Sequence, residues 1–411
     1  MKLPEGRARR SLATMGAASL AALVAAGFYL KPGITNRQLA AVPSAKPASA
    51  WLLTGASFAD SAHGTVQLRR YPPSGPGRQS TVSFLTWDGG KTWHAVASGR
   101  LGVVLARFVD SGIALLQAGD GLGETTTQVS VDGGRTWRRL TDPGPNSRAG
   151  LPVFLDGDHA WWVDQSAIPG TPVAIWRTAD SGRSWQRLAA SGLVLNGFAD
   201  EVVFVDDLHA ALVSRSLDGR VFSLFVTADG GKTWRAVETP AVQLLDARLL
   251  SFTLIKHGRR LLAWLIAVPA AILSRSGVVA FPPGTRIDFR TFVSVSDDGG
   301  ETWSLPQKGP SVVMPPVFLP VPQLDDRGHL LLLDDRRLLV SPDDGASWIA
   351  TAIKVTSSLR PGLLVGAGSG VLFALAQKPG PAGTPGQNSR LLLLRSTDAG
   401  AHWSPVALPR P

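Results

Sequence analysis

The residues in this sequence that could do chemistry are chiefly carboxylates and arginines, and cysteine is absent. Without cysteine the chain has no thiol nucleophile, no thiolate metal site and no disulfide. A pair of carboxyl groups held about 5 to 10 Å apart can hydrolyse glycosides, and aspartates are plentiful here. The sequence leaves a two-carboxylate glycosidase open as an enzymatic alternative, while it predicts no metal and no cofactor.

A second set of polar side chains could bind an acidic partner. Most of them are arginines in segments that we expect to connect strands, and arginines gathered on one surface attract anionic groups. The candidate binding residues are Arg69, Arg70, Tyr71, Arg78, Arg275 and Arg286. Ordinary surface charge is the alternative interpretation. No residue is assigned a catalytic role.

An eight-residue motif predicts the elements that position these side chains. It reads (Ser/Thr)-x-Asp-x-Gly-x-(Thr/Ser)-Trp and occurs seven times, at intervals of 44 to 69 residues. Its aspartates are Asp88, Asp132, Asp180, Asp229, Asp298, Asp343 and Asp398, and its tryptophans are Trp93, Trp137, Trp185, Trp234, Trp303, Trp348 and Trp403. In the last copy, His402 replaces the second hydroxyl residue. A repeat of this length indicates a propeller or another repeat fold.

The residue types of the motif suit a hairpin turn. The aspartate can accept hydrogen bonds from the backbone N–H groups that follow it, which closes an Asx-type turn. The glycine two places later can take a positive φ. The tryptophan begins the next strand and supplies an apolar ring to the core. We therefore interpret these aspartates as structural and not as catalysts or metal ligands.

The motif resembles the Asp-box, or BNR repeat, of sialidases and related β-propellers. The resemblance covers residues 50–411 and implies an all-β fold, a seven-bladed β-propeller of four-stranded antiparallel blades. The Asp-box would be the turn between the third and fourth strands of each blade. It would share one face with the turn between the first and second strands, so binding loops are expected on the opposite face.

A second repeated pattern predicts the hairpins between first and second strands. Apolar segments flank Asp/Gly turns at 108–112, 154–163, 204–213 and 324–329. The histidines in these turns are interpreted as turn residues and not as ligands. Between the fourth and fifth Asp-boxes, the uncharged run 261–273 is interpreted as a buried strand and hairpin, with an exposed apolar surface as the alternative.

The N-terminal segment, residues 1–35, predicts membrane targeting. Residues 11–30 carry no charge and follow basic residues, which indicates a transmembrane or signal helix with the propeller outside the cytoplasm. Residues 36–49 read as a linker. The expected location is the inner membrane, single-pass, with the propeller on the periplasmic side, or the periplasm if the segment is cleaved.

Two related families suggest different functions. The sialidase mechanism is poorly matched, because no Arg-Ile-Pro motif occurs and the two tyrosines, Tyr29 and Tyr71, stand early in the chain. The turn pattern ending in His209, followed by the box ending in Trp234, is similar to photosystem II stability/assembly factor-like propellers, which implies a non-catalytic scaffold. We expect binding to a protein complex of the cell envelope or to an acidic glycan. The net charge of +10 is too diffuse to predict nucleic-acid binding.

Overall fold

The computed structural model describes most of the chain from Trp51 onward. The described residues are 51–70, 80–100, 104–119, 125–141, 143, 152–163, 173–240, 247–269, 286–314, 318–334, 337–353, 360–378 and 390–410. The expected N-terminal helix, the linker, Tyr71, Arg78 and Arg275 lie outside these ranges. Within them, no helix is long and apolar enough to cross a membrane.

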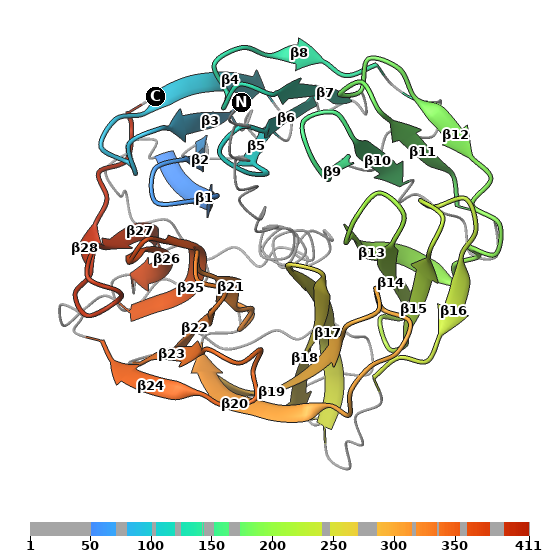
Figure 1. The fold of residues 1–411 in the computed structure, drawn as a ribbon. Helices are drawn as coiled ribbons and strands as arrows, with labels where there is room; N and C mark the ends of the chain where they lie inside the picture. Colours follow the sequence, from blue (N-terminus) through green and yellow to red (C-terminus); the bar gives the residue numbers. More distant parts are fainter. Residues whose placement is uncertain are drawn as a thin grey trace, which may run out of the picture.

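Seven antiparallel blades of four strands each form a ring (Figure 1), which confirms the predicted propeller. Blade 1 has β1 (Trp51–Phe58), β2 (Gly64–Arg70), β3 (Ser80–Thr86) and β4 (His94–Arg100); blade 2 has β5 (Val104–Phe108), β6 (Ala114–Gly119), β7 (Thr125–Ser130) and β8 (Arg138–Arg139). Blade 3 has β9 (Val153–Phe154), β10 (Ala160–Val163), β11 (Ile175–Thr178) and β12 (Gln186–Leu188); blade 4 has β13 (Gly197–Phe204), β14 (Ala210–Ser216), β15 (Phe222–Thr227) and β16 (Arg235–Val237). Blade 5 has β17 (Ala247–His257), β18 (Arg260–Pro269), β19 (Ile287–Ser296) and β20 (Gln307–Met314). Blade 6 has β21 (Gln323–Leu324), β22 (Leu330–Asp334), β23 (Arg337–Ser341) and β24 (Ile349–Ala352); blade 7 has β25 (Arg360–Gly368), β26 (Val371–Lys378), β27 (Arg390–Ser396) and β28 (Ser404–Pro405).

The core of the protein lies between neighbouring blades. Because strand side chains alternate between two faces, each blade buries one set against the preceding blade and one against the next. In β13 and β14, for example, Phe204 and Leu212 pack toward blade 3, whereas Val203 and Val213 pack toward blade 5. The second strand of blade 5, β18, is buried along nearly its whole length. This confirms the predicted buried strand at the start of the run 261–273; residues 270–273, and with them the predicted hairpin, lie outside the described residues.

No strand is exchanged between the first and last blades among the described residues. Blade 7 is completed by its own β28, which pairs with β27. A single bridge between Leu53 of β1 and Leu391 of β27 links the two sheets. The rings of Phe58 and Phe373 stack at 3.6 Å across the same junction. The ring is therefore closed mainly by side-chain packing.

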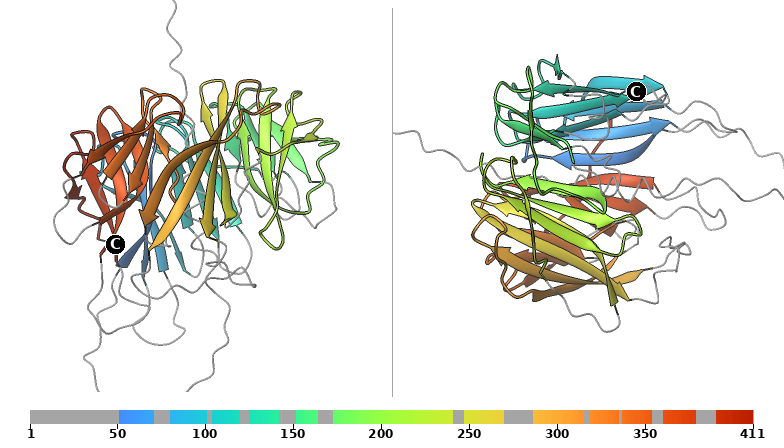
Figure 2. Two further views of the ribbon diagram at one scale, coloured as in Figure 1. Left: turned by 90° about the horizontal axis from the view of Figure 1, so that it is seen from below. Right: turned by 90° about the vertical axis from the view of Figure 1, so that its right-hand side faces the viewer.

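The two ends of the ring differ. All seven Asp-boxes are the turns between third and fourth strands, and they share one face with the turns between first and second strands, as the sequence predicts. We call this the Asp-box face and the opposite one the loop face. Figure 2 shows the strands running from one face to the other. Arg69 and Arg70 belong to β2 and not to a loop, because β2 extends to Arg70 at the loop face.

Candidate functional site

Each Asp-box is a hydrogen-bonded turn in which the aspartate is the central acceptor. In the second box, Ser130 Oγ donates to Asp132 Oδ1 at 2.7 Å, the Thr136 N–H donates to the same oxygen at 2.9 Å, and Thr136 Oγ donates to Oδ2 at 2.6 Å. The hydroxyl and backbone donors of Thr136 hold the pKa of Asp132 well below its usual value. The last box keeps this arrangement although His402 replaces the second hydroxyl residue, since His402 Nδ1 lies 2.6 Å from Asp398 Oδ2. The carboxylates are thus committed to their turns.

Backbone conformation in the boxes is more demanding than the sequence suggests. The glycine two places after the aspartate has a positive φ in all seven copies, as expected. The residue directly after the aspartate also has a positive φ in all seven, and in three copies it is not glycine. Those three residues are Ser181, Asp344 and Ala399, with φ of 60°, 57° and 55°. The sequence alone does not predict a positive φ directly after the aspartate, because three of the seven copies have a residue other than glycine there.

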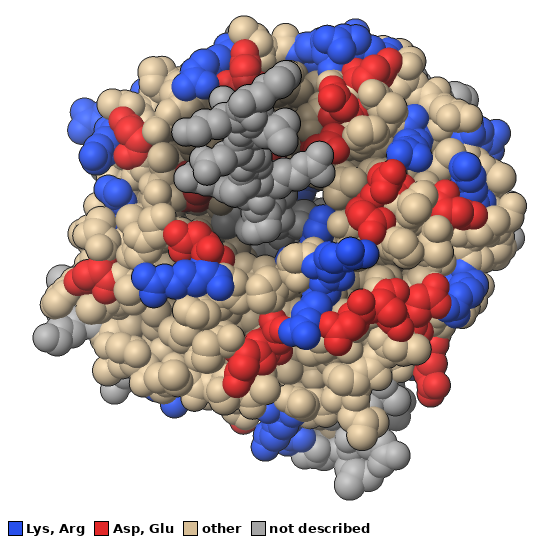
Figure 3. All heavy atoms as spheres, in the orientation of Figure 1, with Lys and Arg blue, Asp and Glu red and all other residues tan. Residues whose placement is uncertain are grey.

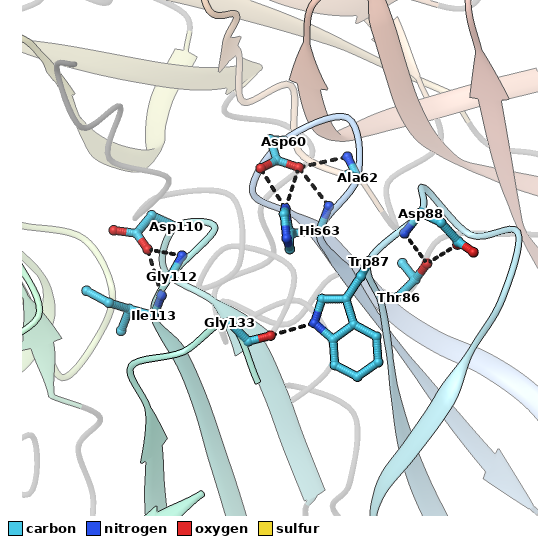
Figure 4. Close-up of polar contacts among 10 residues, drawn as sticks. All are labelled: Asp60, Ala62, His63, Thr86, Trp87, Asp88, Asp110, Gly112, Ile113 and Gly133. Carbon is cyan, nitrogen blue, oxygen red and sulfur yellow. Dashed lines mark hydrogen bonds and ion pairs between the residues drawn. The ribbon is translucent and has the colours of Figure 1, made fainter. Parts of the chain in front are cut away.

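Neighbouring turns on the Asp-box face are joined to one another (Figure 4). The Gly89 N–H donates to the carbonyl oxygen of Ala62 in the adjacent turn of blade 1 at 2.9 Å. Trp87 Nε1 donates to the carbonyl oxygen of Gly133 in the box of blade 2 at 2.5 Å. The boxes therefore tie hairpins together within a blade and fasten one blade to the next.

The histidines of the first-to-second-strand turns are turn residues, as predicted. Asp60 Oδ1 accepts the N–H of His63 at 2.7 Å, and His63 Nδ1 lies 2.9 Å from Asp60 Oδ2 (Figure 4). The same pairing occurs for Asp156 with His159 and for Asp206 with His209. Among the described residues, no group of three or more histidines and carboxylates is arranged to hold a metal.

Charges of both signs alternate around the Asp-box face. Figure 3 shows this face, with lysine and arginine side chains interspersed with aspartate and glutamate and no large area of one sign. Ionic contacts cross between blades here. Arg235 of blade 4 pairs with Glu301 of blade 5. Asp344 of blade 6 accepts hydrogen bonds from His257 and Arg260 of blade 5, at 2.6 and 2.8 Å. A surface with such mixed charges is suited to contacts that hold neighbouring blades together and not to binding a strongly charged ligand.

The predicted arginine cluster is only partly described. Arg69 and Arg70 end β2 in blade 1, and Arg69 Nε is sealed from solvent without a hydrogen-bond partner. Arg286 stands beside β19 in blade 5, where its Nη2 donates to the Val313 carbonyl oxygen at 3.0 Å. Blades 1 and 5 are not neighbours in the ring (Figure 1), so Arg286 does not join Arg69 and Arg70 in one compact cluster.

An apolar surface that the sequence did not single out lies at the loop-face end of blade 4. It consists of Phe198, Leu217 and Val221, whose exposed fractions are 47%, 59% and 59%. Strand register brings them together, because Phe198 is paired with Arg215 and the turn holding the other two follows directly. We call these three residues the blade-4 surface.

The turn that presents the blade-4 surface is well ordered by its own hydrogen bonds. Ser216 Oγ donates to Asp218 Oδ1 at 2.6 Å, and the Val221 N–H donates to Ser216 Oγ at 3.0 Å. Gly219 supplies the positive φ that the turn needs. Leu217 and Val221 are thus held outward on a preformed turn.

Next to this surface lie two adjacent carboxyl groups, those of Asp200 and Glu201. Arg215 binds Asp200 with two hydrogen bonds, Nε to Oδ2 at 2.7 Å and Nη2 to Oδ1 at 3.3 Å. Burial raises the pKa of Asp200, although the charge of Arg215 opposes this. The neighbouring Glu201 accepts the N–H of Leu254 from blade 5 at 2.8 Å. Burial raises the pKa of Glu201 to about 8, so this carboxyl group holds a proton at neutral pH.

Comparison with known proteins identifies the repeat and the fold. The family model of the BNR/Asp-box repeat matches residues 294–305, around the fifth box. Xyloglucanase Xgh74A of Acetivibrio thermocellus is 26% identical over 155 residues, which are 37% of this chain and only 17% of the xyloglucanase.

Solved structures that match this chain are distant from it in sequence. The β-propeller domain of the trilobed protease from Pyrococcus furiosus, described as having an open velcro topology, matches with a TM-score of 0.50 and 8% identity over 87% of this chain and 98% of that domain. YCF48 bound to D1 peptide matches with a TM-score of 0.42 and 19% identity, over 81% of this chain and 93% of that chain. At 8% identity, the match to the trilobed-protease domain shows a shared fold alone. The chain is a seven-bladed β-propeller with an Asp-box, or BNR repeat, in every blade.

Proposed function

We propose that this protein is a non-catalytic scaffold that binds a protein partner through the loop face of blade 4. The observation that carries the proposal is the blade-4 surface, in which Leu217 and Val221 are exposed on a preformed turn beside the exposed Phe198 of β13. Contiguous exposed apolar side chains are typical of protein interaction sites. Because the turn is already ordered, binding would cost little conformational entropy.

The proposed setting is the cell envelope. The uncharged segment 11–30 with basic residues before it supports an inner-membrane anchor, or export to the periplasm after cleavage. Arg69 and Arg70 at the loop-face end of β2 support an acidic glycan as a further ligand on the same face. The partner proposed first is a protein complex of that compartment.

Site-specific crosslinking tests the proposed binding surface. A photoreactive amino acid is placed at Leu217 in the full-length chain, with Ile349 as the control position, since Ile349 is equally exposed (61%) on the outer strand β24. We expect one discrete crosslinked protein from position 217 and none from position 349. The product should disappear when Val221→Asp is added. Equal crosslinking from both positions would argue against the proposal.

A glycoside hydrolase on the same fold is the second candidate. It is favoured by Glu201, whose protonated carboxyl group lies beside the Asp200 carboxylate. The same preparation is therefore assayed with a panel of fluorogenic glycosides. Turnover that is abolished by Glu201→Gln, without any partner crosslinked at position 217, would replace the scaffold with the hydrolase. We expect no turnover from the scaffold.

A further inference from the structure

A carboxyl group joins the innermost strands of blades 4 and 5. The register between β13 and β14 shifts between Ala199 and Glu201, so Asp200 is an extra residue in a β-bulge. Beyond the bulge, Glu201 and Val203 face blade 5. Glu201 Oε2 accepts the N–H of Leu254, a residue of β17 that is 53 positions away in sequence.

The hydrogen bond satisfies a donor that the sheet does not use. In the strand order of blade 5, β17 stands at the edge and has only β18 beside it. Amides along such an edge need a partner from outside their sheet. The Leu254 N–H finds one in Glu201, and Leu254 itself is buried in the apolar interface with Leu265 and Val213. Glu201 therefore adds a polar link to the apolar contacts between these two innermost strands.

The surroundings of Glu201 disfavour its ionised form. Glu201 Oε1 is sealed from solvent and has no hydrogen-bond partner, and an unpaired buried charge is costly. The nearest charged group on its own strand is Asp200, which is negative and is bound by Arg215 of β14. From blade 5, Lys256 also faces this interface, but its charge interacts with Asp206. Burial raises the pKa of Glu201 to about 8.

We propose that Glu201 is a proton-dependent lock: its protonated form holds β13 against β17, and its ionisation loosens the interface between blades 4 and 5. The lock needs no partner protein and no catalytic activity. It acts within the pH range of ordinary growth conditions, so it would let a propeller outside the cytoplasm respond to the pH around it. The blade-4 surface begins on β13 three residues before Glu201, so a looser interface would also reach that surface.

The direction of the pH effect follows from proton linkage. The folded state keeps a proton on Glu201 that an unfolded or locally opened chain releases above a pKa of about 4.5. Stability of the interface is therefore greatest below that pKa, falls as the pH rises, and levels off above about 8. Between pH 5 and 7, the equilibrium constant for local opening should rise about tenfold per pH unit.

Hydrogen exchange at the Leu254 amide tests the lock in the full-length protein. After correction for the intrinsic exchange rate, we expect protection of this amide to fall about tenfold per pH unit between pH 5 and 7. Glu201→Gln keeps an oxygen acceptor for Leu254 but cannot ionise, so its protection should not change with pH. Asp218→Asn is the matched control, because this exposed turn carboxylate has a lowered pKa and does not titrate in the window.

Two results would overturn the proposal. One is protection of Leu254 in the unaltered protein that does not change with pH. The other is a Glu201→Gln variant that keeps the pH dependence of the unaltered protein. If that variant does not fold, the first measurement still decides, since it requires no substitution.

Discussion

Trp93 Nε1 donates a hydrogen bond of 3.0 Å to the carbonyl oxygen of Ala407, although 314 positions separate the two residues. Trp93 belongs to the Asp-box of blade 1, whereas Ala407 follows the last strand of blade 7. Val406 is anchored beside it, because its N–H donates to the Leu393 carbonyl oxygen at 2.8 Å. Val406 and Leu408 also pack against the same core cluster as Trp93. The segment after β28 thus fastens the last blade to the first without exchanging a strand.

Replacing Trp93 by phenylalanine should weaken this junction. The variant loses the hydrogen bond to Ala407 and part of the buried ring, so we expect the free energy of unfolding to fall by about 1–2 kcal/mol in urea denaturation. Trp303→Phe is the matched control, since its indole donates to Gly300 of its own box. Faster amide exchange at Leu53 and Leu391 should occur in the Trp93 variant only. Equal exchange at these positions in both variants would contradict ring closure through Trp93.

Acid should weaken the Asp-boxes, and Asp88 allows this to be measured. Burial alone would raise its pKa, but hydrogen bonds from Thr92, Thr86 and the Lys91 N–H outweigh burial and lower it to about 2. A carboxylate with a lowered pKa contributes stability above its unfolded pKa, and this contribution is lost as the pH falls toward 2. Asp88→Asn should therefore have a lower melting temperature at pH 5 but a shallower decline between pH 4 and 2. An unchanged slope would show that the turn does not depend on the ionised carboxylate.

The Asp-box predicts much of this fold from sequence, because its information is local. Hydroxyls, aspartate and glycine within eight residues determine a turn, and seven such turns at blade-like spacing predict the number of blades. The same locality explains why Asp60 and His63 could have been recognised as another copy of the turn seen at Asp156 and His159. Both segments read Phe-x-Asp-x-x-His.

Contacts between blades could not be predicted in this way. Whether Glu201 faces blade 5 depends on one extra residue at Asp200, because a shift of one position turns every following side chain to the other face. Exposure of Phe198 and Leu217 likewise depends on which neighbouring segments cover blade 4. A single sequence carries no signal for either feature, since both arise from packing between distant segments.

Relief of backbone strain should stabilise the last Asp-box. Ala399 has a φ of 55°, a conformation that side chains disfavour. Glycine also gives the unfolded chain more conformational entropy, which opposes the relief of strain. Because we expect the relief of strain to be the larger effect, Ala399→Gly should raise the free energy of unfolding by roughly 0.5–1 kcal/mol. Gly89→Ala is the opposite test at the equivalent place, where an added Cβ would lie 2.6 Å from the Ser61 carbonyl oxygen. It should destabilise the protein in the same urea assay.

Asp344 occupies the same position in the sixth box, with a φ of 57°, but glycine should be unfavourable there. Its carboxylate, only 11% exposed, accepts hydrogen bonds from His257 and Arg260 of the preceding blade. The hydrogen bond from His257 to this largely buried carboxylate outweighs the strain that glycine would relieve. Asp344→Gly should therefore lower the free energy of unfolding by about 1 kcal/mol or more, whereas Ala399→Gly raises it. Stabilisation by both substitutions would mean that backbone strain, and not the ionic contact between blades 5 and 6, dominates at this position.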